Sequence, residues 1–250
     1  MERHILMELG LDVARDGDEV HGSAAIVPEM WAPGTTSLRT SILATWVDHV
    51  CGLATIDVLA PRVPVTLELD VHLYGPAPAD GSVRAAARVL KAGRTVVVCA
   101  VDLSDGAGEP LGIGAASFMV APDPGVALPD GVSADAVRRV DHRPLTEPFA
   151  ARAGCRRRAP GVAELPRSAD GLNAAGTVNG GLIALAVEEA ALSLAPGATL
   201  TSLALRYLRP VRVGPAVATA EVRAGLGRVE VRDAGSGDRP VATATTRIQR

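Results

Sequence analysis

The stretch "LNAAGTVNGGLIALAVEEAA" (residues 172–191) joins a polar loop to an apolar helical pattern that contains Glu188 and Glu189. The start of a helix presents backbone N–H groups without intrahelical partners, together with the positive end of the helix dipole. Adjacent glutamates on a helix point about 100° apart, so only one of them can face a given site. We expect the other glutamate to face solvent or an interface.

A second apolar helical pattern, "ILATWVDHVCGLA", contains Asp48. Its mostly apolar neighbours would partly desolvate the carboxylate, which raises the pKa and the basicity of Asp48. A lone aspartate in a buried helix can also pair with an arginine or cap a neighbouring element. His49 follows directly and points elsewhere, so we expect it to serve packing or an interface.

The two helical patterns belong to a divergent internal repeat. Residues after Val71 align with residues after Leu205 at an offset of 134, which matches Pro76 with Pro210, Gly93 with Gly227 and Arg94 with Arg228. Upstream, Asp48 aligns with Glu188 at an offset of 140. Repeats of this kind indicate tandem structural units. We predict one unit over residues 1–125, a linker over 126–144 and a second unit over 145–250.

Each unit is predicted to contain one long helix, at about 38–59 and 179–194, followed by alternating strands. The helices are apolar on nearly all sides, so they should be buried. An antiparallel sheet wrapped around such a helix would bury it but would leave a bare edge, and sheet edges pair. The sequence therefore predicts an α+β protein in which two sheets join edge to edge, with both helices near the seam.

Composition excludes several classes of protein. The 250 residues include 48% hydrophobic and 2% aromatic residues, and the formal net charge is −3. This composition does not indicate binding to nucleic acid or to an anionic membrane. No apolar run has membrane-spanning length and the N-terminus lacks a secretory pattern, so we expect a cytoplasmic protein. The three cysteines suit reduced, buried thiols, and no residue spacing indicates a metal or another cofactor.

The loop-to-helix stretch carries the most specific pattern in the chain. Asn173 is followed by Gly176-Thr177, then by Asn179-Gly180-Gly181, and Glu188 comes nine residues after Asn179. This resembles the hotdog-fold acyl-CoA thioesterases of the PaaI-like branch, whose pattern is Asn, Gly-Thr and His-Gly-Gly, with an acid nine residues after the His. Asn179 stands at the position of that His. The resemblance implies a double hotdog: two copies of a long central helix wrapped by an antiparallel β-sheet.

In that family, a site combines the loop and helix start of one unit with the acid of the other. The resemblance therefore implies two composite sites. The first combines Asn173, Asn179 and Gly180 with Asp48 and Thr66. The second combines Glu188 with Arg39 and Thr40, and it has lost the loop pattern, with Trp31 in place of Asn173. We expect one working site and one remnant.

The resemblance also implies roles for these residues. The catalytic set is Asp48, Gly180, Asn173 and Thr66: the N–H of Gly180 would polarise the thioester carbonyl, Asp48 would act as general base or nucleophile, Thr66 would orient the water, and Asn173 would add a polar contact. The substrate-binding set is Asn179, Gly181, Arg94 and Arg228, in which the arginines would contact a CoA phosphate unless they are solvated turn residues. His72 is expected on the same strand face as Thr66.

The predicted function is hydrolysis of an acyl-CoA to free acid and CoA, by a protein that forms homo-oligomers and uses no metal or other cofactor. Two alternatives stay open. One is an acyl-thioester hydratase or dehydratase on the same fold, which usually needs a His paired with an acid. The other is a degenerate acyl-CoA-binding module without turnover. The identity of the acyl group and the number of subunits cannot be read from the residues.

Overall fold

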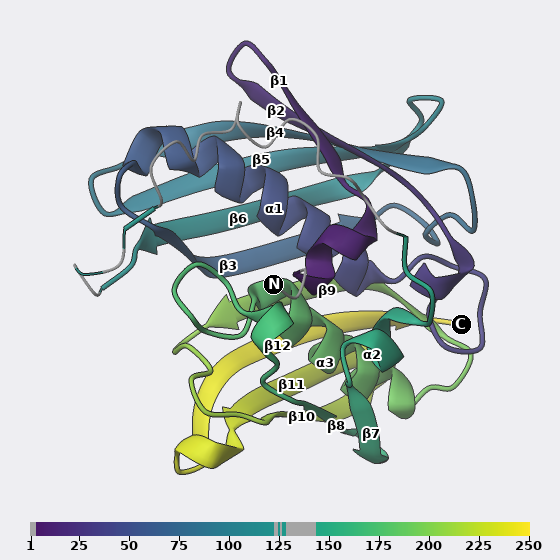
Figure 1. The fold of residues 1–250 in the computed structure, drawn as a ribbon. Helices are drawn as coiled ribbons and strands as arrows, with labels where there is room; N and C mark the ends of the chain where they lie inside the picture. The colour runs from purple at the N-terminus through teal and green to yellow at the C-terminus, as the bar shows by residue number, and fades with distance from the viewer. Residues whose placement is uncertain (1–3, 123–124, 126, 129–143) are drawn as a thin grey trace.

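A computed structural model describes residues 4–122, 125, 127–128 and 144–250 (Figure 1). The described chain builds one antiparallel sheet of 12 strands in the order β1-β2-β4-β5-β6-β3-β9-β12-β11-β10-β8-β7. Read from each outer edge to the centre, the two halves of the sheet use corresponding strands in the same order. The predicted linker, 126–144, lies almost entirely outside the described residues, and the predicted unit boundaries stay a prediction.

The elements of the first half precede the predicted linker. They are η1 (Ile5–Leu9), β1 (Asp12–Asp16), β2 (Glu19–Ala25), η2 (Pro28–Met30), α1 (Thr40–Leu59), β3 (Pro64–Leu73), β4 (Ser82–Ala92), β5 (Val96–Asp105) and β6 (Pro110–Val120). The elements of the second half follow it. They are α2 (Phe149–Arg152), β7 (Arg156–Ala159), β8 (Val162–Leu165), η3 (Ala169–Gly171), α3 (Gly180–Ser193), β9 (Thr199–Tyr207), β10 (Ala216–Arg223), β11 (Leu226–Asp233), η4 (Ala234–Ser236) and β12 (Arg239–Gln249).

Strands β3 and β9 join the two halves into one sheet, as expected from the bare edges. They pair antiparallel from Glu68, opposite Arg206, to His72, opposite Ser202. The Arg206 guanidinium bridges this seam, with Nη1 at 2.5 Å from Asp70 Oδ1 and Nε at 3.2 Å from Glu68 Oε1. Backbone pairing and ion pairs together fix the position of one half relative to the other.

Helices α1 and α3 each pack across their own half of the sheet and contact each other near the seam (Figure 1). Most of their residues are buried, which explains why both sequences are apolar on nearly all sides. Gly181, in the first turn of α3, allows the close approach of the helices, because a Cβ there would lie 2.3 Å from Oγ1 of Thr45 on α1. A small residue is therefore required at this crossing.

An irregularity in β3 corrects the expectation that Thr66 and His72 share a face. The pairing of β3 with β6 shifts register between Thr66 and Glu68, so Leu67 is an extra residue in the strand. Such a bulge reverses the side on which the preceding residue points. Thr66 consequently turns toward α1, whereas His72 is exposed on the outer face and contacts the Ser202 hydroxyl at 2.8 Å.

Within the described part of the chain, no helix is both long enough and apolar enough to cross a membrane.

The helix crossing provides a test of the seam. Gly181→Ala should lower the free energy of unfolding by about 1–3 kcal/mol, because the added methyl group overlaps Thr45. Thr45→Ala removes the two side-chain atoms nearest to the new methyl group, so the double variant should recover part of the loss. Chemical denaturation of the two single variants and the double variant measures this coupling. Additive effects would show that the helices do not touch at this point.

Candidate functional site

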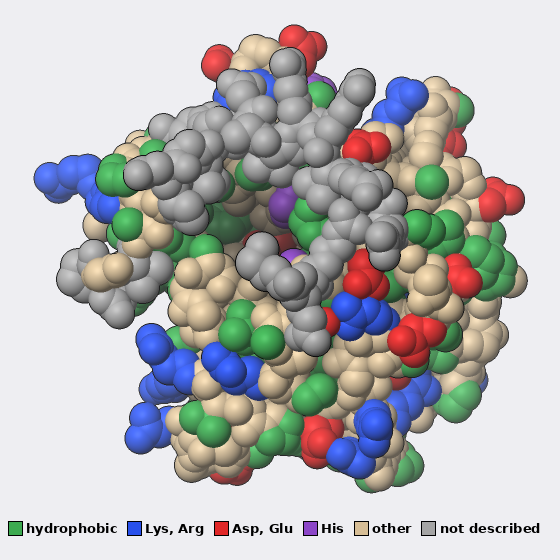
Figure 2. All heavy atoms as spheres, viewed as in Figure 1, with side chains coloured by type: hydrophobic (Ala, Val, Ile, Leu, Met, Phe, Trp, Pro, Cys, Tyr) green, Lys and Arg blue, Asp and Glu red, His purple; other side chains and the backbone are tan. Residues whose placement is uncertain are grey.

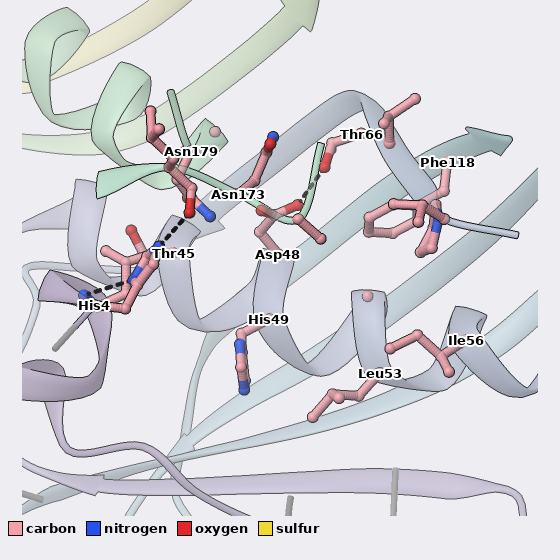
Figure 3. A pocket seen from close by; sticks show the side chains of 18 of the residues that line it. His4, Thr45, Asp48, His49, Leu53, Ile56, Thr66, Phe118, Asn173 and Asn179 are labelled. Atoms are coloured by element: carbon pink, nitrogen blue, oxygen red, sulfur yellow. Dashed lines mark hydrogen bonds between the residues drawn. The ribbon is translucent and has the colours of Figure 1, made fainter. Parts of the chain in front are cut away.

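The site is centred on the carboxylate of Asp48, in the third turn of α1. Asp48 Oδ2 lies only 3.5 Å from the point where a Cβ on Gly180 would sit, so the acid of one half adjoins the helix start of the other. Figure 3 shows Asp48 on α1 beside the segment that carries Asn173 and Asn179. The structure thus brings together the main residues of the first composite site expected from the sequence.

Thr66 holds the carboxylate in place. Its hydroxyl donates a hydrogen bond of 2.8 Å to Asp48 Oδ1 (Figure 3). Burial raises the pKa of Asp48 to about 6, against the lowering effect of this hydrogen bond. Above pH 6 the group is therefore mostly a carboxylate, and it is more basic than an ordinary aspartate. A general base near neutral pH needs these properties.

The first turn of α3 supplies hydrogen-bond donors. Asn179 is the N-cap, and its Oδ1 accepts from the Gly181 N–H at 2.8 Å. The Gly180 carbonyl accepts from the Tyr207 hydroxyl at 2.9 Å, which fixes the orientation of this peptide. Among the described residues, nothing accepts a hydrogen bond from the Gly180 N–H. Gly180 therefore retains a backbone donor at the positive end of a helix, beside the Asp48 carboxylate.

Asn173 organises the loop that leads into α3. Its Oδ1 accepts from the N–H groups of Ala175 and Thr177 and from the Thr177 hydroxyl, at 3.0–3.1 Å. The side-chain oxygen is thus occupied within the loop, and only the amide NH₂ remains for a ligand. Asn179 and Gly181 likewise serve the helix cap and the helix crossing. These contacts give three residues of the expected binding loop a structural task.

A pocket of about 360 Å³ opens beside Asp48. Its walls come from η1, from α1 and from the loop before α3, and Figure 2 shows a hollow in this face with hydrophobic and histidine side chains inside it. Residues along α1 form one wall, namely Thr45, Trp46, Asp48, His49, Gly52, Leu53 and Ile56. The expectation that His49 serves only packing or an interface is therefore incomplete, because His49 also lines this pocket.

A second pocket, of about 250 Å³, lies on the other side of the same residues. Both pockets are lined by Val65, Thr66, Asn173 and Gly180. Toward β9 and the segment after it, the second pocket is lined by Tyr207, Leu208, Arg209, Pro210, Val211 and Arg212. Gly180 and Thr66 are therefore reached from both pockets, whereas Asp48 lines only the first.

Sequence reasoning missed the contribution of the N-terminus. His4 lines the pocket, and its Nδ1 accepts from the Leu6 N–H, so its Nε2 donates to the Leu172 carbonyl at 2.9 Å. Burial lowers the pKa of His4. Arg152 secures this segment further through ion pairs with Glu8 at 2.7 Å and Asp170 at 2.8 Å. No pattern in the sequence indicates these contacts, because they join residues far apart in the chain.

The expected second site is a buried ion cluster. Arg39 Nη1 lies 3.1 Å from Glu188 Oε2 and 2.7 Å from Glu189 Oε1, and Glu188 also accepts from the N–H and the hydroxyl of Ser41. The sequence predicts that one of them faces solvent or an interface; both glutamates are buried, so the solvent alternative is wrong, and Glu189 instead contacts Arg39 from the other half. The buried Glu189 carboxylate is compensated by two cations, because Arg157 lies 2.6 Å from it in addition to Arg39.

Three of the expected residues lie apart from the Asp48 pocket. Arg94, in the turn between β4 and β5, and Arg228, on β11, are exposed, and neither lines either pocket at the seam. The Thr40 hydroxyl donates to the Leu200 carbonyl at 2.6 Å and so contributes to packing between the halves.

The structure gives no indication of a metal centre. Within the described ranges, no group of three or more His, Cys, Asp or Glu side chains is arranged to hold a metal ion. Cys51, Cys99 and Cys155 are buried free thiols, in agreement with the sequence-based expectation.

Residues 41–111, which include Asp48 and Thr66, match the family model described as Thioesterase superfamily. Among solved structures, an acyl-ACP thioesterase from Bacteroides thetaiotaomicron VPI-5482 is similar at a TM-score of 0.64 and 14% identity, over 93% of this chain and 98% of that one. The 12:0-ACP thioesterase from Umbellularia californica is similar at a TM-score of 0.64 and 15% identity, over 94% of this chain and 99% of that one. No curated protein matches the sequence.

These findings concern one segment and the fold. Residues 41–111 are similar to the Thioesterase superfamily, and the α+β fold is similar to that of solved thioesterases, which supports the coarser expectation from the sequence. The PaaI-like branch and the division into two hotdog repeats stay predictions.

The Thr66–Asp48 hydrogen bond gives a testable pKa. Thr66→Val should raise the pKa of Asp48 above about 6, because the interaction that favours the charged carboxylate is lost while burial remains. Thr66→Ser keeps a hydroxyl and should leave the value close to that of the wild type. NMR titration of the Asp48 carboxyl carbon measures the three values. An unchanged pKa in Thr66→Val would show that the hydroxyl does not bind this carboxylate.

Proposed function

We propose that this protein is an acyl-CoA thioesterase with a double hotdog fold and one working composite site per chain. The observation that carries the proposal is the position of Asp48, whose carboxylate has a raised pKa and adjoins the start of α3 inside a pocket. The family match over 41–111 and the likeness to acyl-thioesterase structures support the same chemistry.

The reaction follows from these positions. The thioester carbonyl oxygen accepts a hydrogen bond from the Gly180 N–H, and the Asp48 carboxylate takes a proton from a water that attacks the carbonyl carbon. Thr66 already donates its proton to Asp48, so it can only accept from that water, which orients the water between the two groups. The tetrahedral intermediate then collapses, the C–S bond breaks, and the proton on Asp48 passes to the leaving sulfur.

Direct attack by the Asp48 carboxylate on the carbonyl carbon is the other route, and it requires the same ionised group. The C–S bond then breaks to give an acyl-Asp48 anhydride, which water hydrolyses. Single-turnover hydrolysis in H₂¹⁸O distinguishes the routes. Label in the Asp48 side chain, or formation of an Asp48 hydroxamate when hydroxylamine is present, indicates the nucleophilic route. Label in the product acid with neither of these indicates the general base.

The two pockets support a substrate with two arms. The pocket along α1 is mainly apolar beyond Asp48 and suits the acyl group, whereas the second pocket is bordered by the exposed Arg209 and Arg212 and suits the thiol arm with its phosphates. These arginines take the place of Arg94 and Arg228 in the proposal. CoA and a carrier protein both present a phosphopantetheine arm. Each assay therefore compares the hydrolysis of acyl-CoA with that of the corresponding acyl-carrier-protein thioester.

The Glu188 cluster is proposed to be catalytically silent. Glu188 occupies the position that corresponds to Asp48, but Arg39 neutralises it, and the Ser41 hydroxyl and N–H occupy its oxygens. This carboxylate is fully buried and its oxygens are occupied, so it is closed to water and to a substrate. The cluster instead fixes the helix starts across the seam.

The proposal includes the division of the chain into units, its assembly and the two alternative functions. The halves 1–125 and 145–250 are taken as the two hotdog units, joined by 126–144, and a homo-oligomer is expected. A hydratase reaction is disfavoured by His4, because both of its ring nitrogens are occupied by Leu6 and Leu172. Binding without turnover remains a distinct outcome of the assay below.

Asp48→Asn should lower kcat for acyl-CoA hydrolysis at least about 100-fold, because the amide cannot accept a proton. Glu188→Gln should leave kcat of the folded protein within a few-fold of the wild type, although its melting temperature should fall, because Arg39 loses part of its compensation. Release of free thiol from acyl-CoA and acyl-carrier-protein substrates, together with thermal melts, measures both. Equal losses of kcat in the two variants would contradict a single working site.

The pH profile follows from the raised pKa. Because the reactive form of Asp48 is the carboxylate, kcat/KM should rise with pH and level off above about pH 6. Water addition to an enoyl thioester would indicate the hydratase instead, and binding of acyl-CoA without release of thiol would indicate the binding module.

A further inference from the structure

The pocket continues along one face of α1 beyond Asp48. Gly52 comes one turn after Asp48, and Ile56 comes one turn after Gly52, so the three positions follow one another along the helix. At 1.5 Å per residue, the distance along the helix axis from Asp48 to Ile56 is about 12 Å. Figure 3 shows Leu53 and Ile56 further along the helix from Asp48, with Phe118 nearby. The pocket therefore extends along α1 from Asp48 as far as Ile56.

This part of the pocket is apolar. Beyond Asp48 its lining consists of Gly52, Leu53, Ile56, Val63, Phe118 and Leu128. Among all described residues that line the pocket, Asp48 is the only aspartate, glutamate, lysine or arginine. A charged acyl group would lose its hydration here without gaining an oppositely charged Lys or Arg partner among the described lining residues, whereas an apolar chain would be buried favourably.

Gly52 is unexpected inside this helix. A glycine in a helix interior destabilises it by about 0.5–1 kcal/mol relative to alanine. Elsewhere at the helices, glycine is required by close packing: a Cβ on Gly114 would lie 2.7 Å from Val47 Cγ2, and one on Gly181 would lie 2.3 Å from Thr45 Oγ1. A Cβ on Gly52 would meet nothing closer than the Phe118 ring, at 3.9 Å, which is an ordinary contact. Packing therefore does not explain why this residue has no side chain.

We call the part of the pocket between Asp48 and Ile56 the channel. We infer that Gly52 is a specificity-determining position that keeps this channel open for an apolar acyl chain directed toward Ile56. The inference rests on the proposed function, since it assumes that the acyl carbonyl lies between Asp48 and Gly180. A side chain at position 52 would project into the channel between Asp48 and Phe118 and would shorten the chain that can bind. The substrate class is accordingly an acyl group longer than acetyl and without charge.

Gly52→Leu provides the direct test. For thioesters from acetyl to lauroyl, the variant should lower the ratio of kcat/KM for chains long enough to pass Gly52 to kcat/KM for acetyl by at least about tenfold, because the loss of a fitting apolar contact changes discrimination by this order. Gly52→Ala should show a smaller loss and should melt no lower than the wild type, since alanine favours the helix. Gly75→Ala is the matched control, because a Cβ there meets nothing within 4 Å and Gly75 does not line the pocket.

Binding separates this inference from the proposed function. Non-hydrolysable alkyl-CoA thioethers report chain length by calorimetry, whether or not the protein turns over a thioester. If the wild type hydrolyses no substrate but Gly52→Leu still weakens binding of the long thioethers selectively, the proposed function is wrong and the channel stands. Equal effects of Gly52→Leu on short and long chains in a folded variant, or a wild-type preference for charged acyl groups such as succinyl, would overturn the inference.

Discussion

The pairing of β3 with β9 is the constraint on which the candidate site depends. It joins the two halves of the sheet, and the Arg206 ion pairs with Asp70 and Glu68 reinforce its register. Because α1 and α3 are each fixed to their own half, this pairing also brings the acid of α1 to the start of α3. Gly181 then lets the helices approach closely enough for Asp48 to adjoin Gly180. A slip by one residue at the seam would turn every side chain of one strand to the other face.

Two carboxylates occupy corresponding places at this seam, and their surroundings give them opposite character. Glu188 is compensated by Arg39, whereas the Asp48 carboxylate is buried beside a hydroxyl and a helix start. Burial raises the pKa of Asp48 from 3.8 to about 6, so between these pH values the folded chain binds a proton that the unfolded chain releases. The free energy of unfolding contributed by Asp48 therefore falls as pH rises through this window. The group is least favourable for folding at the pH at which it is most useful as a base.

Much of this arrangement could be predicted from the residues. The apolar helices, the Asn179-Gly180-Gly181 start and the two acids at corresponding positions are local patterns, and edge pairing follows from the need to satisfy backbone groups. The position of Thr66 could not be derived from alternation alone, because the bulge at Leu67 reverses the face on which it lies. The burial of Glu189 depends on its ion pair with Arg157, which lies 32 residues away in the chain, so no local pattern indicates it. Similarly, the contact between His4 and Leu172 exists only once the chain has folded.

A seam that holds one compensated and one uncompensated carboxylate requires the halves to differ, and a single chain permits that difference. In an assembly of identical units, both helix starts would carry the same residues, so a cation that stabilises one acid would also neutralise the other. Here the start of α1 carries Arg39 and Ser41 and compensates Glu188, while the start of α3 carries Asn179 and Gly180 and leaves a backbone donor beside Asp48. One end of the helix pair can thus stabilise the seam while the other retains an uncompensated carboxylate and an open pocket. The Arg39–Glu188 cluster helps to hold Asp48 in position beside Gly180, since both depend on the same crossing of α1 and α3.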